Sequence, residues 1–103
     1  MVITDTSGRI VDVNEAFTRI TGYGRHEALR QSTRMLKSGR QGPEFYAQMW
    51  GGLKAAGYWR GEVWNRRKDG EVYAEMLTIS AVRDEAGATL NYLAIFSDIT
   101  PIK

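Results

Sequence analysis

The sequence predicts an α+β fold in which a five-stranded antiparallel sheet carries short helices and one longer helix on one face. Apolar residues recur at helical spacing between residues 43 and 56. After Gly57 the apolar period changes to two residues, which is typical of strands. Near the start of the chain, two β-branched runs flank a glycine-containing turn and indicate a hairpin. The expected order is two strands, short helices, one longer helix and three strands.

The hairpin comprises residues 2–5 and 9–13, and a short helix follows it. Asn14 suits the N-cap of this helix, because its side-chain oxygen can accept from the free N–H groups of Ala16 or Phe17. Gly22 suits the position just after the helix, where the backbone often needs a positive φ. These residues predict a helix that ends at about residue 21.

Short helical pieces are expected at residues 25–29 and 33–36, followed by a loop over residues 38–42. Pro43 suits the first turn of the next helix. In that helix the apolar side chains Phe45, Met49 and Leu53 recur every four residues, so they share one face. This helix is the strongest in the chain, and it ends at Gly57.

Three strands are expected at residues 58–67, 72–82 and 89–99. The turns between them, at residues 68–70 and 84–87, are short and contain glycine. The three strands therefore form an antiparallel meander.

Both faces of these late strands are apolar, although a sheet that is covered on one side should alternate apolar and polar residues. Since helices can cover one face, the outer face needs a second subunit or a flanking helix. We expect a homodimer, and its contact face is predicted to contain Trp64, Met76, Leu93 and Ile95.

The composition excludes several classes of protein. The 103 residues are 43% hydrophobic and 25% charged with a net charge of +2, as expected for one globular domain. The basic run 66–68 is followed at once by acidic residues. We therefore interpret it as part of a turn, that is, as turn chemistry, and expect no nucleic-acid binding. The absence of cysteine excludes disulfides, thiolate metal sites and thiol catalysis.

Few residues in this chain are arranged as catalytic groups would be. The serines have no base in a triad-like arrangement, and the glycines form no phosphate-binding loop. We therefore expect a domain that is not an enzyme. No apolar run approaches the roughly 18 residues of a membrane span, and no signal peptide is present, so we expect a cytoplasmic protein.

Three segments, in order, resemble the PAS family of sensory domains. Residues 3–23 read ITDTSGRIVDVNEAFTRITGY, residues 65–73 read NRRKDGEVY, and residues 98–100 read DIT. The resemblance covers essentially the whole chain, and it implies a sheet with strand order 2-1-5-4-3. The chain is expected to be a single domain, residues 1–103, cut from a longer protein without its N-terminal flanking helix and C-terminal effector.

Residues 35–62 are most similar to bacterial PAS modules of the sensory-box type. Such modules precede diguanylate cyclase and phosphodiesterase domains of cyclic di-GMP signalling, or the histidine kinases of two-component systems. The resemblance therefore implies a sensor in signal transduction that acts on an effector in cis. This is an analogy at the level of the family.

PAS domains hold ligands between the central helices and the inner face of the sheet. By resemblance, the pocket-lining candidates are Asn65, Glu75, Leu77 and Phe96. Asn65 matches an amide that hydrogen-bonds the edge of a flavin ring, and Glu75 matches a second polar contact. Phe96 occupies a third position that is usually polar, and it cannot serve there. Flavin, an unidentified small molecule and no ligand stay open; without a ligand, Asn65 and Glu75 would satisfy each other.

Two kinds of cofactor chemistry are disfavoured. Light-sensing flavin domains carry a cysteine at the position of Thr33, so this chain cannot form a cysteinyl adduct with flavin. Haem-binding members usually supply a histidine from the long helix, whereas the single histidine, His26, lies in an early polar stretch. No metal site is predicted.

Asp98 and Thr100 are predicted to relay the signal, because in the family they tie the last strand to the start of an output helix. Asp98 is expected to accept a hydrogen bond or to pair with a base near the exit of the chain. The alternative is a simple cap on the end of the strand.

Overall fold

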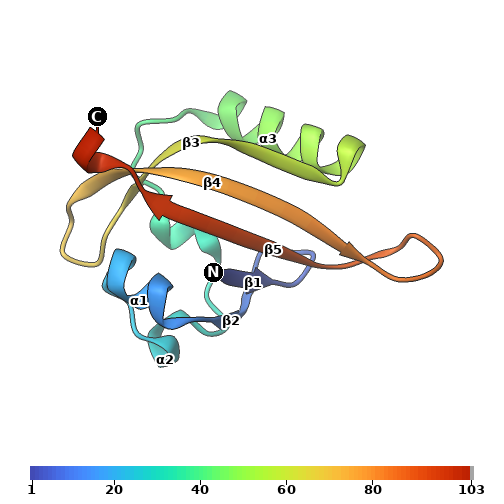
Figure 1. Cartoon of the computed structure of the whole chain (residues 1–103), viewed down its shortest axis with the longest axis horizontal. Coiled ribbons are helices and arrows are strands. Elements are labelled where there is room, and N and C mark those ends of the chain that lie inside the picture. Colours follow the sequence, from blue (N-terminus) through green and yellow to red (C-terminus); the bar gives the residue numbers. More distant parts are fainter. Residues whose placement is uncertain (103) are drawn as a thin grey trace.

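One antiparallel sheet of five strands organises the computed structural model, which describes residues 1–102. The strand order is β2-β1-β5-β4-β3 (Figure 1), which confirms the predicted order. The strands are β1 (Val2–Thr4), β2 (Ile10–Val13), β3 (Tyr58–Arg66), β4 (Val72–Arg83) and β5 (Thr89–Asp98).

The helices begin and end where the capping residues predict. Helix α1 (Glu15–Thr21) starts after Asn14, whose Oδ1 accepts from the N–H of Phe17 at 3.1 Å. Gly22 follows α1 with φ of 82°, and Gly57 follows the long helix with φ of 81°. The remaining helices are α2 (Arg25–Ala28), the 3₁₀ helix η1 (Thr33–Leu36), α3 (Pro43–Ala56) and the 3₁₀ helix η2 (Thr100–Ile102).

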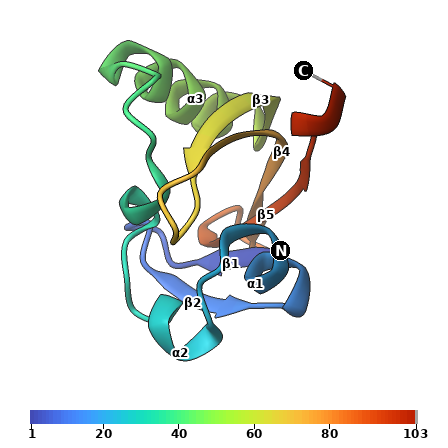
Figure 2. The ribbon, with the colours of Figure 1, turned by 90° about the vertical axis from the view of Figure 1, so that its left-hand side faces the viewer.

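The helices divide into two groups at opposite edges of the sheet. Figure 2 shows α3 beside β3 at one edge, and α1 and α2 near β2 at the other. Between these groups, η1 connects the two edges across the inner face of the sheet. The inner face of the middle strands lies between these two groups of helices.

Strand alternation sorts the side chains onto two faces, as the period of two predicts. Inner-face positions are buried and join the core beneath the helices; those of the late strands are Val63, Leu77, Ile79, Tyr92 and Ala94. On the outer face Ile95 is 58% exposed, while Met76 and Leu93 are partly covered by their neighbours. The helices therefore cover one face of the sheet.

Candidate functional site

A cavity of about 560 Å³ lies between the sheet and the helices α3 and η1. Its volume falls within the range of about 300–1,000 Å³ that is usual for small-molecule sites. The four predicted pocket residues, Asn65, Glu75, Leu77 and Phe96, all line it. Thr33 lines it too, from the start of η1. The inner-face parity of the strands explains why these residues meet.

The polar centre of the cavity is formed by Asn65 and Glu75, which are 9% and 2% exposed. The hydroxyl of Tyr73 donates to Oε1 of Glu75 at 2.7 Å. Burial raises the pKa of Glu75 to about 7, although hydrogen bonds from Tyr73 and Asn65 act in the opposite direction. Asn65 and Glu75 therefore interact, but Tyr73 is a partner that the sequence alone did not indicate.

Four aromatic side chains contribute to the rest of the wall: Tyr46, Trp50, Tyr92 and Phe96. Trp50 of α3 meets Tyr92 of β5 edge to face, with ring centroids 5.2 Å apart. Phe96 meets Phe17 in the same manner at 6.2 Å, so Phe96 is held by the core behind it. Such rings offer a ligand flat, apolar surfaces. The signal that could have placed Tyr92 here is its alternation with Ala94 and Phe96 along one strand.

The outer part of the cavity wall is basic. Arg34 and Lys37 contribute from η1 and its C-cap, and Lys54 contributes from α3. All three side chains are exposed, and no ion pair within residues 1–102 involves them. The Lys37 ammonium lies 4.1 Å from the ring centre of Tyr46. Three bases against the single acid Glu75 favour an anionic ligand. Sequence reasoning missed these bases because Arg34 and Lys37 belong to η1 and its C-cap and Lys54 belongs to α3, and only the tertiary structure brings the two helices to one cavity.

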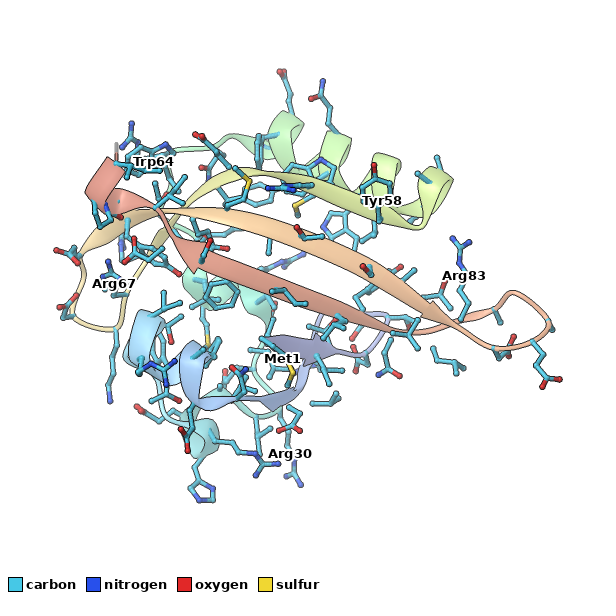
Figure 3. All side chains as sticks on the ribbon, viewed as in Figure 1. Met1, Arg30, Tyr58, Trp64, Arg67 and Arg83 are labelled. Carbon is cyan, nitrogen blue, oxygen red and sulfur yellow. The ribbon has the colours of Figure 1, made fainter. Side chains whose placement is uncertain are left out.

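Arg67 is the centre of a second cluster, at the end of the sheet where the chain leaves (Figure 3). Its guanidinium pairs with Asp98 at 2.6 Å and with Glu71 at 2.5 Å, and it donates to the carbonyl of Ile20 at 2.6 Å. It also lies 4.2 Å from the ring centre of Tyr73. The interpretation of residues 66–68 as turn chemistry alone was therefore incomplete.

Asp98 and Thr100 both make the contacts that their predicted positions suggest. The Thr100 N–H donates to Oδ1 of Asp98 at 2.9 Å, and Oγ1 of Thr100 accepts from the N–H of Ala74 at 3.1 Å. Burial opposes ionisation of Asp98, but hydrogen bonds from Thr100 and Arg67 outweigh it and hold its pKa below the ordinary value. Asp98 thus pairs with a base, and Thr100 ties the exit to β4.

Within the predicted dimer face, the four residues differ in exposure. Ile95 is open, whereas Trp64, Met76 and Leu93 are partly covered. The guanidinium of Arg40 stacks over the Trp64 ring, 3.9 Å from its centre. Part of the Trp64 surface is therefore covered by the chain itself.

Comparison with known proteins decides the family. The family model described as the PAS domain matches residues 1–101. The chain belongs to the PAS family. A crystal structure of a PAS domain from Colwellia psychrerythraea superposes with a TM-score of 0.91 and 26% identity, covering 97% of this chain and 85% of that one.

Two further matches bear on function. A light-oxygen-voltage domain studied with a flavin analogue is 31% identical, with a TM-score of 0.86 over 95% of this PAS domain and 75% of that chain. A nitrogen fixation regulatory protein from Klebsiella oxytoca is 37% identical over 95% of this PAS domain. The match covers 20% of that protein, so the PAS domain spans about a fifth of the length of this relative.

His26 is exposed on α2 and does not line the cavity. Across residues 1–102, no three His, Asp or Glu side chains gather closely enough to hold a metal ion. The helices of the same residues include none with the length and apolarity that a membrane crossing needs.

Proposed function

We propose that this PAS domain is the sensory module of a bacterial signal-transduction protein and binds an anionic, planar small molecule in its cavity. The cavity itself carries this proposal. Its walls include four aromatic rings, its outer part carries three bases, and its polar centre is formed by Asn65 and Glu75. A ligand-free dimerisation domain would have a filled core, which a cavity of about 560 Å³ does not favour.

A flavin nucleotide is the specific ligand that these residues fit best. The polar edge of its ring would lie against Asn65 and Glu75, and its phosphate would lie against Arg34, Lys37 or Lys54. When bound, a flavin supplies redox and light-absorbing chemistry. Thr33 has no thiol, so a redox sensor fits this chain better than adduct-forming photochemistry. Phe96 offers the ring an apolar contact in place of a hydrogen bond.

The output of the domain is proposed to leave through Asp98 and Thr100. Both residues hold the end of β5 against β4 and Arg67, next to the wall of the cavity. A ligand needs to shift such an equilibrium by only about 1–3 kcal/mol to change the output several-fold. We propose a C-terminal effector in cis, either a diguanylate cyclase or phosphodiesterase or a histidine kinase, in the cytoplasm and with no catalysis by this domain.

The ligand is tested by an absorption spectrum of the purified domain and by mass spectrometry of the supernatant after denaturation. Flavin bands confirm the specific ligand, and a colourless anion supports an anion-binding sensor without flavin. The Ala94→Leu variant fills the cavity and should lose the ligand, whereas Ala88→Leu makes the same change in the exposed β4–β5 turn and should keep it. Equal retention by both variants would contradict the proposed site.

The partner of the outer face is proposed to be a second copy of the domain. The supporting observation is that Ile95 is open on a face that the helices leave uncovered. Light scattering should show a dimer that the double change Trp64→Glu, Ile95→Glu converts to a monomer. Leu90→Glu is the control, because this exposed residue lies at the register shift near the start of β5 and outside the four residues of the proposed contact face. A dimer that survives the double change would refute the outer-face interface.

A further inference from the structure

Two carboxyl groups lie side by side where the chain leaves the sheet. Glu75 of β4 and Asp98 of β5 are directly paired across the two strands. Directly paired residues project from the same face of a sheet, with Cβ atoms about 5 Å apart. Glu75 lines the cavity, while Asp98 holds the exit, so the cavity and the exit meet at this pair.

Tyr73 provides a second connection between the same two places. Its hydroxyl donates to Glu75 at 2.7 Å, and its ring is fully buried. The guanidinium of Arg67 covers that ring at 4.2 Å and pairs with Asp98 at 2.6 Å. The Tyr73 side chain therefore contacts Glu75 through its hydroxyl and Arg67 through its ring.

The contacts at the exit form a small unit that we name the exit clasp: Arg67, Ala74, Asp98 and Thr100. Asp98 accepts from Arg67 and from the N–H of Thr100, and Thr100 accepts from the N–H of Ala74. The neighbouring N–H of Ile99 also donates to the carbonyl of Ala74, at 2.9 Å. These hydrogen bonds position the start of η2: two of them end on the Asp98 carboxylate, and the other two join Thr100 and Ile99 to the backbone of Ala74.

We propose that Glu75 is a proton-operated switch for the exit clasp. In its neutral form Glu75 leaves Asp98 free to hold Arg67 and Thr100. In its ionised form it repels the Asp98 carboxylate, and the clasp loosens because like charges on paired strand positions are destabilising. The inference deepens the proposed function, because a cavity ligand that favours one form of Glu75 would then set the state of the exit.

The groups around Glu75 set its charge in opposite directions. Burial and the Asp98 carboxylate from β5 favour the neutral form. Hydrogen bonds from Tyr73 on β4 and Asn65 on β3, together with the amino group of Met1 before β1, favour the ionised form. The balance holds the pKa of Glu75 at about 7, so both forms are populated near neutral pH.

The test is a pH titration by NMR that follows the Glu75 side-chain carbon and the backbone amides of Ala74 and Thr100. We expect all three signals to move with one midpoint near neutrality. In Glu75→Gln the amide titration should disappear. In the control Glu85→Gln, which removes the same charge from the β4–β5 turn at the far end of the hairpin (Figure 1), it should persist.

Two further measurements keep the test decisive. Hydrogen exchange of the Ala74 amide, taken relative to Glu75→Gln at each pH, should speed up by at least about fivefold once Glu75 ionises. In Asp98→Asn the midpoint of Glu75 should fall, since a neighbouring negative charge is removed. An Ala74 or Thr100 amide that does not titrate, or a Glu75 midpoint that Asp98→Asn leaves in place, would overturn the switch.

This experiment needs no added ligand, so its failure is distinct from failure of the proposed ligand site. If the domain retains an anion but the amides of the exit clasp do not titrate, the proposed function stands and the switch is refuted. If the amides titrate but the domain retains no small molecule, the switch stands and the proposed ligand site is refuted.

Discussion

Replacing Glu75 with glutamine should make the domain more stable above neutral pH and leave it nearly unchanged in acid. Glutamine has the same shape as protonated glutamate, and its carbonyl can still accept from the Tyr73 hydroxyl. It cannot ionise. The variant therefore removes the cost of holding a buried carboxylate, while the packing of the cavity wall is retained.

The magnitude follows from the burial of the side chain. Burial raises the pKa of Glu75 from the ordinary 4.5 to about 7 in the folded protein. At about 1.4 kcal/mol for each tenfold change in acidity, this difference corresponds to about 3 kcal/mol. The folded state binds the proton more tightly than the unfolded state. The stability contributed by protonated Glu75 is thus fully present below pH 4.5 and is lost as the pH rises to about 7.

Urea unfolding of the two proteins at a series of pH values measures this term. The difference in free energy of unfolding, variant minus wild type, should rise by about 3 kcal/mol in favour of glutamine between acid and neutral pH. It should stay constant above that range. Groups that both proteins share cancel in the difference. A difference that is flat across the whole range would refute the raised pKa, and with it the buried, desolvated position of Glu75.

Three further predictions concern the cavity, the exit and a helix end. Ala94→Leu should leave the free energy of unfolding almost unchanged, because the new side chain enters the cavity. Ala28→Leu in the filled core should lower it by about 1–3 kcal/mol, as measured by urea unfolding. Equal losses in the two variants would argue against the cavity. Asp98→Asn should cost about 1–2 kcal/mol through its weakened bond to Arg67, and an unchanged unfolding midpoint would contradict this. Gly22→Ala should lower the free energy of unfolding by about 1–2 kcal/mol, because the φ of Gly22 is 82°. An unchanged thermal unfolding midpoint would show that the turn relaxes.

The elements of the fold could be predicted because their signals are local. Asn14 caps a helix through the N–H three residues ahead, and Gly57 ends the long helix through its own backbone conformation. Strand alternation likewise assigns each side chain to a face without knowledge of the partner strand. In β4, for example, Leu77 is buried on the cavity side, while its neighbour Met76 is only partly covered.

The site was predictable only in part, for a physical reason. Asn65 and Glu75 could be placed on the cavity wall from strand parity and from resemblance to the family. Arg67 could not be given its role in the same way, because its partners Asp98 and Ile20 lie 31 and 47 residues away. A basic residue beside a turn is solvated by default, so its neighbours in the sequence do not indicate whether it forms an ion pair.

By itself, then, the sequence determined the order of the elements, the capping residues and the side of the sheet on which each residue lies. These properties depend on neighbours within a few residues along the chain. The tertiary structure alone decided that a cavity remains beneath α3, that Arg34, Lys37 and Lys54 share its rim, and that Glu75 lies opposite Asp98. Those relations depend on strand register and on how closely a helix approaches the sheet, and both are set by the packing of the whole domain.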